Sequence, residues 1–201
     1  IVPFRADMPD IVMQALIKKS GLDIKNDFKL QYVATPVDAM QMLILRRADH
    51  ALLAEPAISI ALRKTGSFPV KLIAPDLYRS INLQEEWGRL YKIEAKIPQA
   101  GLAIIGDTNG KEELISKVLA EYDKSLAWYK NNKEEASKLV VKTLPMLEEK
   151  GLADSIEYVR FENISAIKSK KDLEFFFDIL MQNDSKLIGG KLPNEDFYYK
   201  W

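Results

Sequence analysis

The sequence predicts an α/β fold in which helices cover both faces of a parallel sheet. Three observations predict it. Short apolar runs alternate with amphipathic stretches over residues 1–105, the connections between them are short, and cap or turn residues stand at most boundaries. This alternation is typical of strands that lie parallel because a helix separates each pair. The expected strands are residues 1–4, 28–34, 50–54, 70–74 and 99–105.

The helix boundaries in this part are read from cap residues. One helix carries its apolar residues from Ile11 to Ile17 on one face and ends at Ser20-Gly21. The next begins at Thr35, which can cap it. Pro36 then takes the first turn and Asp38 occupies the capping-box position.

A third helix is expected after Glu55-Pro56, ending at Thr65-Gly66. The sequence becomes less regular over residues 76–98. From residue 111 to 144 it favours helix with a break near Asn131-Asn132, and a further helix spans 171–182. The tail from Gly189 to Trp201 is expected to be loop.

Two parts follow from this pattern: an α/β part over residues 1–98, and a mostly helical part over residues 99–201 that begins with the last predicted strand. The helical part has large apolar faces, such as the stripe from Leu114 to Tyr129, and few strands of its own. We therefore expect its helices to need another structure to pack on.

Composition excludes several classes of function. Lys plus Arg equals Asp plus Glu at 29 each, so the chain lacks the basic excess of a nucleic-acid binder. It contains no cysteine, which excludes disulfides, thiol nucleophiles and cysteine-ligated metals, and its single histidine, His50, excludes a two-histidine metal site. His50 itself is expected in a short buried strand. The sequence has no apolar run long enough to span a membrane and no glycine-rich phosphate-binding motif. We expect no enzymatic activity, no metal and no cofactor.

Candidate binding residues follow from the expected sheet. Ligands of open parallel sheets bind outside the carboxyl ends of the strands, against helix N-termini. The ends in question are 4–9, 34–36 and 54–56. Arg5 can contact an anion held at a helix N-terminus, or it can pair with Asp7 or Asp10 at the surface. Glu55 can accept hydrogen bonds from a ligand or serve the dipole of the following helix, and Trp87 can stack on a ligand or fill the core.

Several segments resemble a known family. Residues 2–10 (Val-Pro-Phe-Arg-Ala-Asp-Met-Pro-Asp) resemble the opening of the second lobe in nitrate/sulfonate/taurine-type periplasmic solute-binding proteins of ABC importers. These proteins share a fold with the thiamine-precursor synthase-like family. Residues 48–56 resemble the family's segment that ends in Glu-Pro, with Arg47 and Ala48 in place of the usual glycine and valine. Residues 98–101 and the tail over 188–199 also match.

The resemblance implies a type 2 periplasmic-binding-protein fold, in which two α/β lobes close on a solute about a hinge. Residues 1–98 would form the second lobe, and residues 99–201 a crossover strand and the C-terminal helices of the first lobe. The sheet of that first lobe would then be missing from this chain. Because half of the cleft would be missing too, we expect weak binding or none by these 201 residues alone.

The resemblance also implies the site and the partners. The ligand-binding wall would comprise Phe4, Arg5, Ala6, Asp7, Met8, Thr35, Glu55 and Trp87. Arg5 would meet an anionic group, and the backbone amides of residues 8–10 would cradle it. The ligand would be a small anionic or zwitterionic solute, the partners would be ABC permease subunits, and the protein would be periplasmic or lipid-anchored outside the cell. The exposed helical faces would permit a dimer.

Three alternatives remain open. A fungal pyrimidine-precursor synthase has the same fold, but the resemblance implies that it uses pyridoxal phosphate, a histidine and a cysteine-rich motif, and this chain has no cysteine. The effector domain of a LysR-type regulator also has this fold and would follow a helix-turn-helix. A lone interaction module without a ligand is the third.

Overall fold

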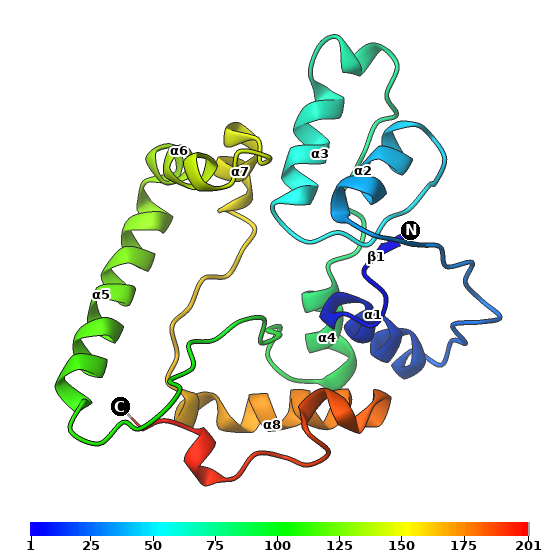
Figure 1. Ribbon diagram of the computed structural model, residues 1–201. Coiled ribbons are helices and arrows are strands. Elements are labelled where there is room, and N and C mark those ends of the chain that lie inside the picture. Colours follow the sequence, from blue (N-terminus) through cyan, green and yellow to red (C-terminus); the bar gives the residue numbers. More distant parts are fainter. Residues whose placement is uncertain (201) are drawn as a thin grey trace. The chain divides into compact units, whose positions relative to one another are not determined.

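The computed structural model describes residues 1–200; Trp201, at the end of the predicted tail, lies outside the described residues. The chain divides into two units (Figure 1). The first comprises residues 1–95 and 130–160, and the second comprises residues 96–129 and the chain from 161 onward. These units do not coincide with the two predicted parts, because residues 130–160 pack with the first unit. The assignment of the parts to lobes stays a prediction.

A small parallel sheet lies in the first unit. Strand β1 (Val2–Pro3) pairs with β2 (Tyr32–Val33), with Val2 opposite Tyr32. A third extended segment lies along the other side of β1. The amino group of Ile1 donates to the His50 carbonyl at 2.8 Å, and the Leu52 amide donates to the Ile1 carbonyl at 2.9 Å. This is the bonding pattern of a parallel pair, so β1 lies between β2 and residues 50–52.

The predicted sheet is larger than the observed one. Residues 70–74 were expected to be a strand but contain the 3₁₀ helix η1 (Val70–Leu72). Its backbone bonds are local, from Lys71 to Ser67 and from Ala74 to Val70, so no neighbouring strand is needed. Residues 99–105 are also no strand; they are exposed and pair with no strand in residues 1–200. His50 is exposed, so the expectation that it lies in a buried strand is wrong.

The predicted end of the first helix and the predicted capping box of the second are confirmed. Helix α1 (Met8–Lys19) begins after Asp7, whose carboxylate accepts the Met8 amide, and ends at Ser20. Helix α2 (Pro36–Ile44) begins with the full capping box between Thr35 and Asp38. Asp and Thr at these positions satisfy amides that a helix leaves without partners in its first turn.

Two further helices complete this part of the first unit. Helix α3 (Ala57–Gly66) follows Pro56 as expected. Helix α4 (Leu83–Tyr91) falls where the sequence suggested no regular structure, with Asn82 accepting the Gln84 amide as its cap. The buried apolar side chains in residues 1–95 are Val2, Ile11, Val12, Leu16, Ile17, Ala39, Met40, Leu43, Ile60, Ala61 and Trp87.

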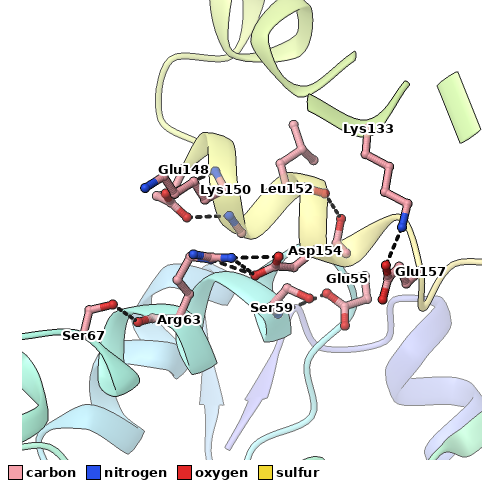
Figure 2. Close-up of polar contacts among 12 residues, drawn as sticks. Glu55, Ser59, Arg63, Ser67, Lys133, Glu148, Lys150, Leu152, Asp154 and Glu157 are labelled. Carbon is pink, nitrogen blue, oxygen red and sulfur yellow. Dashed lines mark hydrogen bonds and ion pairs between the residues drawn. The ribbon is translucent and has the colours of Figure 1, made fainter. Parts of the chain in front are cut away.

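Helices α6 (Lys133–Thr143) and α7 (Glu149–Ser155) belong to the first unit because α7 packs on α3. Their approach is close at Gly151, where an added Cβ would lie 2.7 Å from Ile60 Cγ1. Beside this contact, Arg63 of α3 donates twice to Asp154 of α7, at 2.7 and 2.8 Å (Figure 2). A glycine and a forked ion pair thus hold two helices that are about 90 residues apart in the sequence.

The second unit contains the long helices α5 (Glu112–Asn131, which ends in the first unit) and α8 (Ala166–Asn183), followed by the 3₁₀ helices η2 (Ser185–Ile188) and η3 (Glu195–Phe197). The break between α5 and α6 confirms the one predicted near residue 131. The tail folds back on α8, since Tyr198 is 1% exposed and its hydroxyl donates to Glu174. Helix α5 buries only Ile115 within the described chain. Three residues of its apolar stripe are exposed (Leu114, Val118 and Tyr122) and three are half-buried (Leu119, Leu126 and Tyr129).

Candidate functional site

Three loops of the first unit lie at one edge of the sheet. The extended segments 2–3, 32–33 and 50–52 run parallel, so the loops that follow them emerge at the same edge. The chain passes from β1 to β2 on one side and then back to residues 50–52 on the other. The order of the segments therefore reverses beside β1, which is the place where doubly wound sheets bind ligands.

The loop after β1 is held by a buried carboxylate. Phe4 and Ala6 have positive φ values of 55° and 62°, which cost free energy for residues other than glycine. Asp10 is 0% exposed, and its Oδ2 accepts the Ala6 amide at 2.8 Å. Its Oδ1 accepts from Gln14 Nε2 at 2.9 Å and from the Tyr32 hydroxyl at 3.1 Å. Asp10 thus joins the loop, α1 and β2 in one hydrogen-bonded group.

Arg5 extends from this loop to the surface. It is exposed, and its guanidinium carbon lies 5.0 Å from the centroid of the Tyr32 ring. Neither Asp7 nor Asp10 forms an ion pair with Arg5, and Arg5 has no ion pair within residues 1–200. The alternative in which Arg5 pairs with Asp7 or Asp10 at the surface is therefore wrong. The pKa of Tyr32 is raised by burial first and then by the charge and hydrogen bond of Asp10. Arg5 therefore rests on a neutral aromatic ring with its charge open to solvent.

Of the amides expected to cradle an anion, that of Met8 is already engaged and that of residue 9 does not exist. The Met8 amide donates to Asp7 Oδ1 at 2.8 Å, and Pro9 has no amide hydrogen. Asp7 is exposed and Met8 half-buried. An anion could reach the Met8 amide only if the Asp7 side chain turned away, so this amide is closed to an anion in this conformation.

Thr35 is likewise occupied by its own helix. Its Oγ1 accepts the Asp38 amide at 3.1 Å and donates to Asp38 Oδ2 at 2.7 Å. The Thr35 amide donates to the same carboxylate at 2.9 Å. Thr35 is exposed at the edge, but its hydroxyl has a structural role there.

Glu55, in the third loop, is an internal ion-pair partner. Its side chain is only 8% exposed, and its Oε1 accepts from Arg79 Nη2 at 2.6 Å. Its Oε2 accepts the Ser59 amide at 3.1 Å (Figure 2). The same Arg79 nitrogen donates to Ser59 Oγ at 2.8 Å, and the guanidinium carbon lies 3.6 Å from the centroid of the Tyr158 ring. The Ser59 contact agrees with the second interpretation from the sequence, in which Glu55 interacts with the N-terminal dipole of the following helix.

Trp87 lies in the core. It is 1% exposed on α4, and its ring centroid is 4.7 Å from that of Tyr91. Of the two roles considered for Trp87, the structure therefore shows that it fills the core. The side chain presents no surface to a ligand in this conformation.

Sequence reasoning missed the structural roles of Asp10, Tyr32, Arg79 and Tyr158, and it considered Asp10 only as a surface partner of Arg5 and through its amide. An aspartate in the first turn of a helix has an ordinary explanation in the helix dipole, which hid its role as a buried acceptor. Arg79 lies in the irregular segment before α4, and Tyr158 is 79 residues further along the chain. Of the group formed by Glu55, Arg79 and Tyr158, only Glu55, which precedes Pro56, stood out in the local sequence.

Two kinds of site are not found in residues 1–200. No group of three or more His, Cys, Asp or Glu side chains within them is arranged to hold a metal ion. Every helix of that part of the chain is too short or too polar to cross a lipid bilayer.

Comparison with known proteins gives one informative likeness. No protein-family model and no curated protein matches the chain. Its structure is similar to a crystal structure described as an ABC transporter from Parabacteroides distasonis, with a TM-score of 0.70 and 20% sequence identity over 99% of this chain and 65% of that chain. The two proteins share a fold, and this chain spans less than two thirds of the length of the other.

Proposed function

We propose that this chain is the solute-binding part of an ABC importer and that it takes a small anionic or zwitterionic solute at the shared edge of its three loops. The observation that carries the proposal is Arg5. Its exposed guanidinium has no ion-pair partner within residues 1–200, and it stands at the carboxyl end of β1, where the order of the segments reverses. A planar cation in this position suits a carboxylate or sulfonate, which it can bind through two parallel hydrogen bonds.

The likeness in fold to a protein called an ABC transporter supports the transport role. Together with the resemblance to nitrate/sulfonate/taurine-type proteins, it favours a type 2 binding-protein fold. Such a protein would close two lobes on its solute outside the cytoplasm and deliver it to permease subunits. It would have no catalytic activity. Phe4, Arg5 and Ala6 are exposed members of the proposed wall. Asp7 and Thr35 are exposed too, but they and Met8 would contact the solute only after changes in their present hydrogen bonds.

The proposal is tested by titrating the isotope-labelled chain with methanesulfonate and taurine and following backbone NMR signals, a method that detects weak binding. We expect the signals of residues 4–8 to shift. Arg5→Gln should weaken binding about tenfold, because a charge-assisted hydrogen bond contributes roughly 1.5–3 kcal/mol.

Arg47→Gln is the matched control. Arg47 is exposed and follows the C-terminal end of α2, whereas Thr35 precedes the other end of that helix at the proposed site. Equal affinities in Arg5→Gln and Arg47→Gln, or shifts confined to other segments, would contradict the proposal. Native mass spectrometry of the protein purified from its own host would identify the bound solute itself.

A further inference from the structure

A second group of side chains at the same edge has the composition of a cation-binding site. Glu55 supplies a nearly buried carboxylate, Ser59 a hydroxyl, and Tyr158 the face of an aromatic ring. Ser59 is 3% exposed, whereas Tyr158 is 57% exposed. A carboxylate, a hydroxyl acceptor and an aromatic face are the groups with which proteins bind ammonium and guanidinium ions.

The present occupant of this group is Arg79. One of its nitrogens contacts both Glu55 and Ser59, and its guanidinium stacks on Tyr158. All three contacts are made by the guanidinium, so the end of the Arg79 side chain shows where a ligand cation would lie.

Arg79 comes from a segment with little holding it in place. Residues 75–82 have no regular secondary structure, and within residues 1–200 the amides of 75–81 donate no backbone hydrogen bond. Leu77, packed against the apolar cluster of Met40 and Ile60, is the other anchor of this segment. Withdrawing Arg79 therefore breaks side-chain contacts and leaves the sheet and helices unchanged.

We propose that Glu55, Ser59 and Tyr158 form a subsite for an ammonium or guanidinium group of the solute, and that Arg79 occupies this subsite until the solute displaces it. Glu55 belongs to the loop that follows residues 50–52, beside the place where the segment order reverses. Combined with Arg5, the subsite selects a zwitterion. This last step rests on the proposed function; the subsite itself does not.

Competition by Arg79 lowers the apparent affinity for a solute, because only the fraction of molecules with a vacant subsite can bind. We would measure binding of methylguanidinium, which has no anionic group, to the 201-residue chain by NMR titration. Arg79→Gln should bind it at least about tenfold more tightly than the unaltered chain. In the Arg79→Gln variant, the further substitution Tyr158→Leu should weaken the binding of methylguanidinium about fivefold, because it removes the aromatic face.

Arg63→Gln is the matched control, since it vacates the Asp154 carboxylate, which has no aromatic ring stacked on its partner. If Arg63→Gln gains as much affinity as Arg79→Gln, or if Arg79→Gln gains none, the subsite does not exist. Where Arg79→Gln fails to fold, the side-chain NMR signals of Arg79 in the unaltered chain decide the matter. Methylguanidinium should shift them, and unchanged signals would overturn the proposal.

The outcome is separable from that of the proposed function. Methylguanidinium does not need Arg5, and methanesulfonate does not need Tyr158. Binding of methanesulfonate without methylguanidinium would leave the importer proposal standing and remove the cation subsite; the reverse result would retain only the subsite.

Discussion

The guanidinium of Arg5 lies over the ring of Tyr32, with 5.0 Å between the guanidinium carbon and the ring centroid. The Tyr32 hydroxyl in turn donates to the buried carboxylate of Asp10. An exposed cation is therefore positioned by a strand residue and, through it, by a group in the interior. This chain of contacts links the position of the exposed Arg5 side chain to the buried carboxylate of Asp10.

Asp10→Ala should lower the free energy of unfolding by about 3 kcal/mol, because three donors lose a buried acceptor. Tyr32→Phe should cost about 1 kcal/mol, since it removes one of those hydrogen bonds and keeps the ring. Urea denaturation measures both. Asp49→Ala, at an exposed aspartate with no ion pair in residues 1–200, is the control and should change stability by less than about 0.5 kcal/mol. An effect of Asp10→Ala as small as that of the control would show that the carboxylate does not hold the loop.

Gly151→Ala should destabilise the first unit by about 1–3 kcal/mol, because the new methyl group would overlap Ile60 of α3. Gly66→Ala, at the last residue of α3, provides the comparison. Its added Cβ meets nothing within 4 Å, so stability should stay the same or rise by about 0.4–1 kcal/mol. Thermal unfolding of the two variants should thus move in opposite directions. A tolerated Gly151→Ala would mean that α7 does not approach α3 this closely.

Thr35→Ala should cost about 1 kcal/mol through loss of the capping box at α2. Thr143→Ala, at the exposed C-terminal residue of α6, should cost less than about 0.5 kcal/mol. Chemical denaturation distinguishes them, and equal losses would argue that the Thr35 cap contributes nothing.

Stability should fall in acid partly through Asp154. The hydrogen bonds from Arg63 hold the pKa of Asp154 below its ordinary value, with the charge of Arg63 as a smaller cause. A depressed pKa in the folded state contributes stability that is present above the unfolded pKa of about 3.9 and lost as pH falls through the folded pKa. Asp154→Asn should therefore show a smaller loss of stability than the unaltered chain between about pH 5 and pH 2. Parallel stability curves for the two proteins in urea titrations at each pH would refute this assignment.

The sequence predicted best the features that neighbouring residues determine. The capping box of Thr35 and Asp38, the end of α1 at Ser20 and the break after Asn131 are all encoded within a few residues. That segments 1–4, 28–34 and 50–54 run parallel was also anticipated, although the two observed strands are shorter and residues 50–52 pair with residue 1 without forming a regular strand.

Features that depend on distant partners were predicted less well. An apolar run such as Val70–Ala74 becomes a strand only beside another strand; here local bonds close it into a 3₁₀ turn. Arg79, the ion-pair partner of Glu55, is 24 residues away, and Tyr158, whose ring lies under Arg79, is 103 residues from Glu55. No local sequence pattern indicates either contact. Topology therefore predicted which loops share one edge of the sheet, while the occupation of their polar groups required the structure.

The carboxylate of Asp10 also holds the loop of Phe4 and Ala6 in place. Because this acceptor is fully buried and is shared by the Ala6 amide and the Tyr32 hydroxyl, the left-handed conformations of Phe4 and Ala6 are part of the folded first unit. A solute arriving at Arg5 would thus lose little affinity to the ordering of backbone, and its rate of capture would depend on diffusion and on release of the neighbouring side chains rather than on rearrangement of this loop.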